Sequence, residues 1–110
     1  MSNEYGLPWL KAGAPIRFRT TLSDEAGADI DVSGWPLPEC WVRCPAYNRI
    51  LGRLEVEAVG NGHVFSASGA VTAEWPRELV EWEVRYSPPG EDVFIGPTVG
   101  LLVIGAVHNA

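Results

Sequence analysis

The sequence predicts an all-β protein: an antiparallel two-sheet Ig-like β-sandwich of about seven to eight strands with an extended N-terminal arm. The clearest observation is the segment 79–86, where apolar and charged residues alternate without a break, so that one face of a strand is buried and the other is solvated. Twelve glycines and nine prolines among 110 residues indicate many turns between short elements. No helical period persists over a full window. A small closed barrel is the second possibility.

We divide the chain into an N-terminal arm, residues 1–14, and a sandwich domain, residues 15–110. A domain of this size can bury its own core without a metal or a disulfide. The arm has no hydrophobic period but carries three large apolar side chains, Tyr5, Trp9 and Leu10. We expect either the rest of the domain or a neighbouring subunit to cover them.

Alternation and turn residues place the strands at short, regular intervals, which is typical of a sandwich or a barrel. Prolines and clusters of Ser, Asp, Asn and Gly separate them, because these residues favour turns. The predicted strands cover residues 15–22, 29–35, 39–44, 50–59, 63–68, 79–86, 92–95 and 98–107.

Two connections between strands have specific predictions. Asn61-Gly62 lies between two alternating segments and favours a type I′ hairpin turn, whose two central residues both need positive φ. Residues 72–76 are expected to form a short turn or a single helical turn that crosses between the sheets, with Trp75 closing one end of the core.

The last strand departs from the alternation. Residues 99–107 are apolar on both faces, so neither face is expected to be solvated. Two explanations remain open: the strand is central and lies beneath the arm, or it packs against another subunit. The second explanation makes the protein an oligomer, with Leu102 and Ile104 among the contact residues.

The sequence offers no arrangement typical of catalysis, and we expect no enzyme activity, no catalytic residues and no cofactor. The two histidines lie where a general base is poorly positioned, His63 next to a hairpin tip and His108 near the C-terminus. Glycoside cleavage needs two acids across a cleft, whereas the glutamate pairs of the alternating strands face outward as on any soluble surface.

Metal binding is not expected either. The acidic residues between 24 and 31 match no calcium-loop spacing and are interpreted as turn residues. Cys40 and Cys44 stand ~13 Å apart if they share a strand face at ~3.3 Å per residue, which is beyond disulfide reach. We interpret both cysteines as small buried hydrophobes.

The formal net charge of −6 disfavours a nucleic-acid partner, which needs clustered Lys and Arg. Arg17 and Arg19 come nearest to a cluster and are interpreted as solvated residues that pair with carboxylates. The chain does not begin with a basic segment and an apolar run, so no signal peptide is expected. The apolar run 99–107 is too short to span a bilayer. We expect a protein made in a cytoplasm, with no membrane partner.

Five tryptophans are many for 110 residues and raise the alternative of a module that binds a carbohydrate or another small ligand. Trp82 lies on the inward side of its strand, Trp75 in a corner and Trp35 at a strand end, so all three are expected in the core. Trp41 lies on the strand face opposite the two cysteines and is the one strand tryptophan expected to be exposed. Trp9, on the arm, is suited to anchor a partner.

Four short motifs are followed by a last apolar strand: Arg17-Phe18-Arg19-Thr20-Thr21-Leu22, Asp31-Val32-Ser33-Gly34-Trp35, Thr72-Ala73-Glu74-Trp75-Pro76 and Glu81-Trp82-Glu83-Val84-Arg85-Tyr86. This order resembles the small Ig-like β-sandwich modules of tailed-phage virion proteins, which include N-terminal domains of baseplate upper proteins and of fibre or head-decorating proteins. The resemblance covers roughly residues 15–107 and rests on strand pattern and short motifs.

The resemblance implies a non-enzymatic virion protein that forms a homo-oligomer, often a trimer, and attaches to other virion proteins in the head, neck or tail. Larger members of the family continue into coiled-coil or receptor-binding segments, and a chain that stops at Ala110 is expected to have a structural or decoration role. The residues that we predict to contact partners are Tyr5, Trp9, Leu10, Trp41, Leu102 and Ile104.

Overall fold

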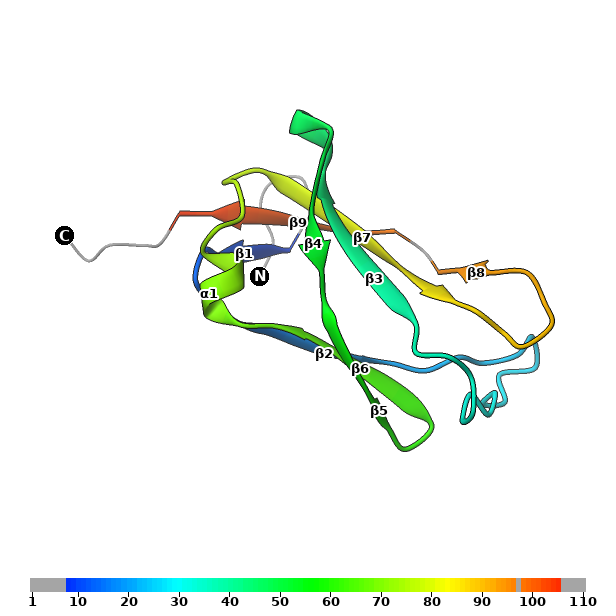
Figure 1. The fold of residues 1–110 in the computed structure, drawn as a ribbon. Helices are drawn as coiled ribbons and strands as arrows, with labels where there is room; N and C mark the ends of the chain where they lie inside the picture. The colour runs from blue at the N-terminus through cyan, green and yellow to red at the C-terminus, as the bar shows by residue number, and fades with distance from the viewer. Residues whose placement is uncertain (1–7, 97, 106–110) are drawn as a thin grey trace.

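Two β-sheets pack face to face, as Figure 1 shows for a computed structural model of the chain. Buried hydrophobic side chains of both sheets form the core between them. The structure describes residues 8–96 and 98–105. Within these residues it contains nine strands, one short α-helix and one 3₁₀ helix. The predicted all-β sandwich is therefore confirmed, with one strand more than the upper end of the predicted range.

The strands of the larger sheet are β1 (Trp9–Lys11), β3 (Glu39–Cys44), β4 (Arg49–Arg53), β7 (Leu79–Tyr86), β8 (Phe94–Ile95) and β9 (Val99–Ile104). Their order is β1-β9-β7-β3-β4, and β8 pairs with the end of β7. Every pair in this sheet is antiparallel except β1 with β9, which is parallel. The sheet is built around β7, the strand whose alternation is clearest in the sequence.

The smaller sheet contains β2 (Ile16–Thr20), β5 (Glu55–Val59) and β6 (Gly62–Ala67) in the order β2-β6-β5. The helices are η1 (Pro45–Tyr47), at the tip of the β3–β4 hairpin, and α1 (Gly69–Thr72). In Ig-like sandwiches one sheet holds strands B, E and D, and the other holds G, F and C with C′ beside C in the variable type. The orders β2-β6-β5 and β9-β7-β3-β4 follow this pattern.

Three aromatic rings fill the centre of the sandwich. Phe18 of β2 stacks on Phe65 of β6, with 5.4 Å between ring centroids, and on Trp82 of β7, with 5.8 Å. Phe65 is fully buried and Trp82 is almost so. The alternation of β7 explains the placement, because Val80 and Trp82 point into the core while Glu81 points outward. Burying one such ring stabilises the fold by roughly 1.5–3 kcal/mol.

The connection from β6 to β7 contains a single helical turn, α1, which lies at residues 69–72, and the predicted segment 72–76 forms the turn that follows it. Helix α1 begins after Ser68, whose hydroxyl accepts a hydrogen bond from the Val71 backbone N–H at 3.3 Å. Trp75 follows the helix and is buried in the core cluster, as predicted. The inward position of Trp82 is confirmed too, and Trp35 is half-buried against Tyr86 at the far end of the sandwich.

The β5–β6 hairpin forms where predicted, but with a different turn. Val59 pairs with Gly62, so the two central residues are Gly60 and Asn61. Only Gly60 has positive φ, at 59°, as in a type II′ turn, and the predicted type I′ turn is wrong. Gly62 is needed for space instead, because a Cβ there would lie 2.6 Å from the Thr20 carbonyl oxygen.

Residues 29–35 form a loop, so the strand predicted there is wrong apart from one isolated bridge at Asp29. A side-chain amide takes the place of a strand partner. Oδ1 of Asn61 accepts from the Val32 N–H at 3.1 Å, and Nδ2 of Asn61 donates to the Ile30 carbonyl at 2.9 Å. The backbone groups that a neighbouring strand would pair are therefore already satisfied.

Part of the predicted arm is a strand of the sandwich. Residues 9–11 form β1, and three residues are too few for a period to show in the sequence. Strand β9 lies between β1 and β7, which agrees with a central strand beneath the arm. Leu101 and Val103 face the core, while Leu102 and Ile104 lie on the outer face and are half-buried. A contact of this outer face with another subunit stays a prediction.

Candidate partner-binding face

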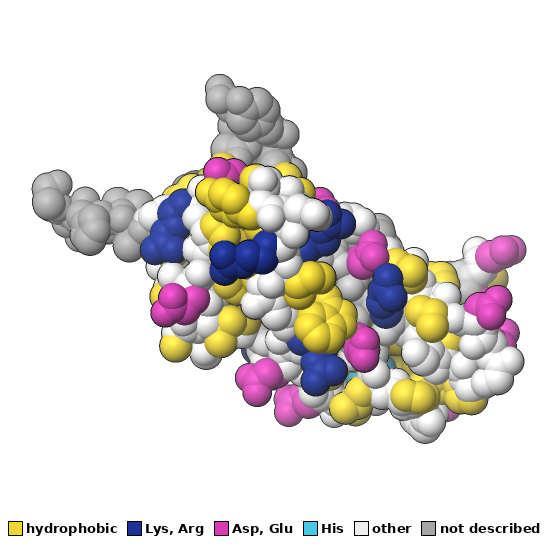
Figure 2. Space-filling view, turned by 45° about the horizontal axis from the view of Figure 1, so that its top comes forward, with side chains coloured by type: hydrophobic (Ala, Val, Ile, Leu, Met, Phe, Trp, Pro, Cys, Tyr) yellow, Lys and Arg dark blue, Asp and Glu magenta, His cyan; other side chains and the backbone are white. Residues whose placement is uncertain are grey.

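The outward side of the β3–β4 hairpin brings together exposed aromatic, aliphatic and basic side chains. We call this group the hairpin face: Trp41, Arg43, Ile50 and Arg53. Figure 2 shows Lys and Arg side chains interspersed with hydrophobic and acidic ones across the middle of the molecule, and Asp and Glu side chains without Lys or Arg at its right-hand end. The hairpin also extends beyond the rest of the large sheet, at the top of Figure 1.

Strict alternation in β3 produces one half of this face. Trp41 points outward and is 42% exposed, while Cys40, Val42 and Cys44 are buried on the other side. The predicted exposure of Trp41 is confirmed, and so is the interpretation of the cysteines as buried free thiols. Burial raises the pKa of the Cys40 thiol to about 12, so it stays protonated at neutral pH.

A bulge in β4 produces the other half. Arg53 pairs with Trp41 and Ile50 pairs with Arg43, although the two β4 residues are three positions apart. The extra residue, Leu51, packs against the core. A period of two would place Ile50 on the inner side, so the sequence pattern does not predict its exposure. The bulge turns Ile50 outward, and Gly52 within the strand is the residue that could have indicated a bulge.

The exposed Trp41 is held in a fixed orientation by two neighbours. Its indole Nε1 donates to Oε1 of Glu39 at 3.2 Å, and the guanidinium carbon of Arg53 lies 5.5 Å from the ring centroid. Arg53 also approaches Glu39, with 3.9 Å between Nη1 and Oε2. A ring restrained in this way loses little conformational entropy when a partner covers it.

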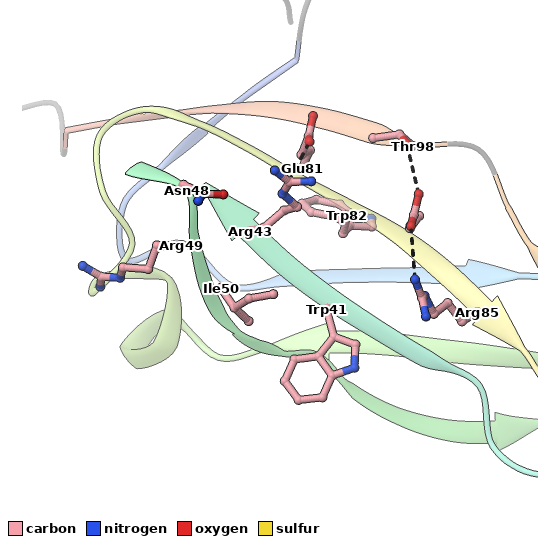
Figure 3. Close-up of a pocket in the computed structure, with 10 residues that line it drawn as sticks. Trp41, Arg43, Asn48, Arg49, Ile50, Glu81, Trp82, Arg85 and Thr98 are labelled. Atoms are coloured by element: carbon pink, nitrogen blue, oxygen red, sulfur yellow. Dashed lines mark hydrogen bonds and ion pairs between the residues drawn. The ribbon is translucent and has the colours of Figure 1, made fainter. Parts of the chain in front are cut away.

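A depression of about 640 Å³ lies beside Trp41, between β3, β4 and β7. Figure 3 shows Trp41 and Ile50 on one side of it and Arg85 and Thr98 on the other. Its wall on β7 is acidic, because Glu81 and Glu83 lie on the outward side of that strand. The depression therefore combines an aromatic ring with groups of both charges.

One ion pair bridges β3 and β7 beside this depression, and a second lies within β7. Arg43 Nε lies 3.7 Å from Glu81 Oε1, and Arg85 Nη2 lies 4.0 Å from Glu83 Oε1. Thr98 Oγ1 donates to Glu83 Oε2 at 3.2 Å. Pairs as exposed as these contribute little stability, at most about 1 kcal/mol each. Their main effect is to fix where charge is presented on the face.

The far end of the sandwich has a different character. We call residues 21–38 and 87–95 the acidic end, because together they carry six carboxylates and no lysine or arginine. Trp35, in the first segment, packs edge-on against Tyr86, the residue that directly precedes the second segment, with 6.3 Å between ring centroids. The acidic end also exposes apolar side chains, among them Phe94 at 50%.

The carboxylates of the acidic end build turns. Oδ1 of Asp24 accepts from the backbone N–H groups of Ala26 and Ala28, each at 2.9 Å. Oδ1 of Asp31 accepts from the Ser33 hydroxyl at 2.6 Å and from the Ser33 N–H at 2.9 Å, and these bonds lower the pKa of Asp31. Across residues 8–96 and 98–105, no three His, Cys, Asp or Glu side chains are grouped as a metal site requires.

His63 lies at the start of β6, next to the hairpin turn as predicted. It is only 3% exposed, however, so the mobility expected at this position is wrong. Its ring packs against Tyr86, with 5.7 Å between centroids, and the Tyr86 hydroxyl lies 2.6 Å from Thr20 Oγ1. Nδ1 of His63 has no hydrogen-bond partner, and burial lowers its pKa. His108 lies outside the described residues.

The structure separates the residues that we predicted to contact partners. Leu10 packs against the core cluster. Trp9 is half-buried and lies next to Leu102 in register, on the outer face of the large sheet; Ile104 shares that face. The exposed Trp41 lies on β3, beyond β7, in a different part of the same sheet. Tyr5 lies outside the described residues.

The strand order defines the chain as an Ig-like β-sandwich. The exposed side chains of the hairpin face and the acidic end make these two surfaces candidates for binding a partner. No family model matches the sequence, and no curated protein matches it. No helix in the described part of the chain is long and apolar enough to cross a membrane.

Proposed function

We propose that this chain is a non-enzymatic structural protein of a tailed-phage virion, which acts through contacts with copies of itself and with other virion proteins. The observation that carries the proposal is the exposure of large apolar side chains at two places. Trp41 and Ile50 are exposed on the hairpin face, and Val93, Phe94 and Ile95 are exposed in the acidic end. Grouped exposed apolar side chains are typical of interaction surfaces.

The residue types of the hairpin face support an assembly role. Tryptophan and arginine are the side chains most enriched among residues that dominate protein–protein binding energy. Here Trp41 is already held in place by Glu39 and Arg53. The Ig-like strand order also agrees with the virion modules that the sequence resembles, whose members act through surfaces.

The test is a search for the chain in purified particles. Particles from a lysate of the cells that encode the chain are banded on a density gradient, and each fraction is analysed by peptide mass spectrometry and by immunoblot. We expect the chain in the particle band, at a constant ratio to the other particle proteins. Recovery of the chain only in the soluble fractions would overturn the proposal. Immunogold labelling of the band then distinguishes head, neck and tail.

A second function, binding of a carbohydrate or another small ligand, is favoured by the depression beside Trp41. An exposed indole edged by carboxylate, amide and guanidinium groups can stack on a sugar ring and hydrogen-bond its hydroxyls. Titration with a glycan panel should then give a saturable change in tryptophan fluorescence that is lost in Trp41→Ala. A flat titration across the panel removes this alternative.

A further inference from the structure

The charges of the chain are divided unevenly between its two exposed surfaces. Residues 39–53, which include the hairpin face, hold three arginines and one glutamate, a formal charge of +2. The acidic end holds six carboxylates and no base, a formal charge of −6. The rest of the chain therefore carries −2, so that the hairpin is one of two basic segments of an acidic protein; the other, residues 9–20, holds Lys11, Arg17 and Arg19 and no acid. Opposite surface charges of this kind steer association.

Both surfaces also present apolar side chains next to their charges. On the hairpin face, Ile50 is 60% exposed and stands in the strand between Arg49 and Arg53. In the acidic end, the exposed Phe94 directly follows the segment Glu91-Asp92-Val93. An apolar centre with a charged rim is the usual composition of a specific protein interface.

We propose that the hairpin face binds the acidic end of a second copy of this chain. In this contact Phe94 and its apolar neighbours cover Trp41 and Ile50, and the carboxylates around them face Arg43 and Arg53. Charge complementarity favours this occupant, since the acidic end holds six carboxylates and no base, while the hairpin has a net positive charge beside its exposed Trp41 and Ile50. The inference rests on the proposed assembly function and specifies which surfaces it uses.

The geometry of this contact fixes its symmetry. It joins two different surfaces, so it is heterologous and leaves one hairpin face and one acidic end free on every pair. Further copies therefore add until a ring closes or a filament grows. A two-fold contact between two hairpin faces is disfavoured, because it would bring the arginines of one copy against those of the other.

The experiment uses two variants of the full chain, each of which blocks one half of the contact. The hairpin variant is Arg53→Glu with Ile50→Glu, and the acidic-end variant is Asp92→Arg with Phe94→Arg. Sedimentation velocity is recorded over a concentration series for each variant, for the unmodified chain and for an equimolar mixture of the two variants.

We expect the unmodified chain to associate with rising concentration, and to do so less when NaCl is raised from about 50 mM to about 500 mM, because salt screens the charges. Each variant alone should bind itself at least about tenfold more weakly, which corresponds to about 1.4 kcal/mol. The mixture should form a heterodimer that grows no further, because each variant retains the half that the other has lost.

Matched controls change the same residue types elsewhere on the surface. Arg17→Glu with Val71→Glu is the control for the hairpin variant, and Glu55→Arg with Val59→Arg is the control for the acidic-end variant; all four residues are exposed. Both controls should associate like the unmodified chain. Circular dichroism and urea unfolding of every variant establish that loss of association is not loss of folding.

Three results would overturn the proposal: an unmodified chain that is monomeric at its highest soluble concentration, an acidic-end variant that associates normally, or two inactive variants whose mixture stays monomeric. The particle test has a separate readout. A chain that assembles by this contact but is absent from particles contradicts the virion function alone. A chain found in particles whose variants associate normally contradicts this contact alone.

Discussion

Replacing Asn61 by alanine should loosen the loop that carries most of the acidic end. The side-chain amide of Asn61 reaches from the β5–β6 turn to the loop and bonds Ile30 and Val32 at 2.9 and 3.1 Å. The Ile30 N–H and the Val32 carbonyl have backbone partners in Leu22 and Trp35, so the two groups that depend on this amide are the Ile30 carbonyl and the Val32 N–H. The variant removes one donor and one acceptor together, and leaves both loop groups to find water.

The expected loss is about 2 kcal/mol, because each hydrogen bond contributes about 1 kcal/mol net. For a domain of this size, 1 kcal/mol shifts the melting temperature by about 4 °C, so Asn61→Ala should melt about 8 °C lower. Asn61→Asp is the sharper variant. It keeps the acceptor for the Val32 N–H but sets a carboxylate oxygen against the Ile30 carbonyl, so it should be at least as unstable although its shape is unchanged.

Two measurements check this prediction. Urea unfolding gives the free-energy loss, and hydrogen exchange of the Val32 amide gives the local opening, which should be faster in both variants. The reasoning is refuted if both variants unfold within about 0.5 kcal/mol of the unmodified chain, the usual range for surface substitutions, with the Val32 amide equally protected.

Three further predictions concern the core. Phe65→Ala should cost about 3–5 kcal/mol in urea unfolding, because the ring is fully buried against Phe18, while the exposed Val59→Ala should change little. Burial lowers the pKa of His63 in the folded chain below its unfolded value of about 6.5, so the unfolded chain binds the extra proton. Stability should be fully present above about pH 6.5 and fall as the pH drops below it, and His63→Gln should flatten this dependence in unfolding curves recorded across pH. The raised pKa and burial of Cys40 predict that a thiol reagent labels it only as fast as the chain opens; rapid labelling without denaturant would contradict this.

The regular strands were predictable because each carries its own pattern. In β3 and β7 the side chains alternate between core and solvent in a period of two, and the sequence alone places Trp41 outward and Trp82 inward. The core position of Trp75 was predictable from the proline that follows it in a corner between strands, whereas helix α1 begins at Gly69, three residues before the predicted turn.

The remaining features depend on contacts between segments distant in sequence. The loop 29–35 reads as a strand because its alternation is genuine, but its partner is a side-chain amide 31 residues away from Ile30 rather than a strand. A period of two along β4 would bury Ile50, but the bulge turns its side chain outward. Burial of His63 follows from the packing of Tyr86 across the sandwich, and no local pattern encodes that contact.

The acidic end is costly to the isolated chain, and this cost bears on assembly. Six carboxylates with no base among them repel one another, which destabilises a compact state. The fold holds them together with a few anchors: the Asn61 amide, and Trp35 packed on Tyr86, whose hydroxyl contacts Thr20. A neighbouring basic hairpin would relieve the repulsion, and any partner that binds only the folded state adds to its stability. The proposed contact should therefore make assembly and subunit stability rise together as the chain concentration is raised.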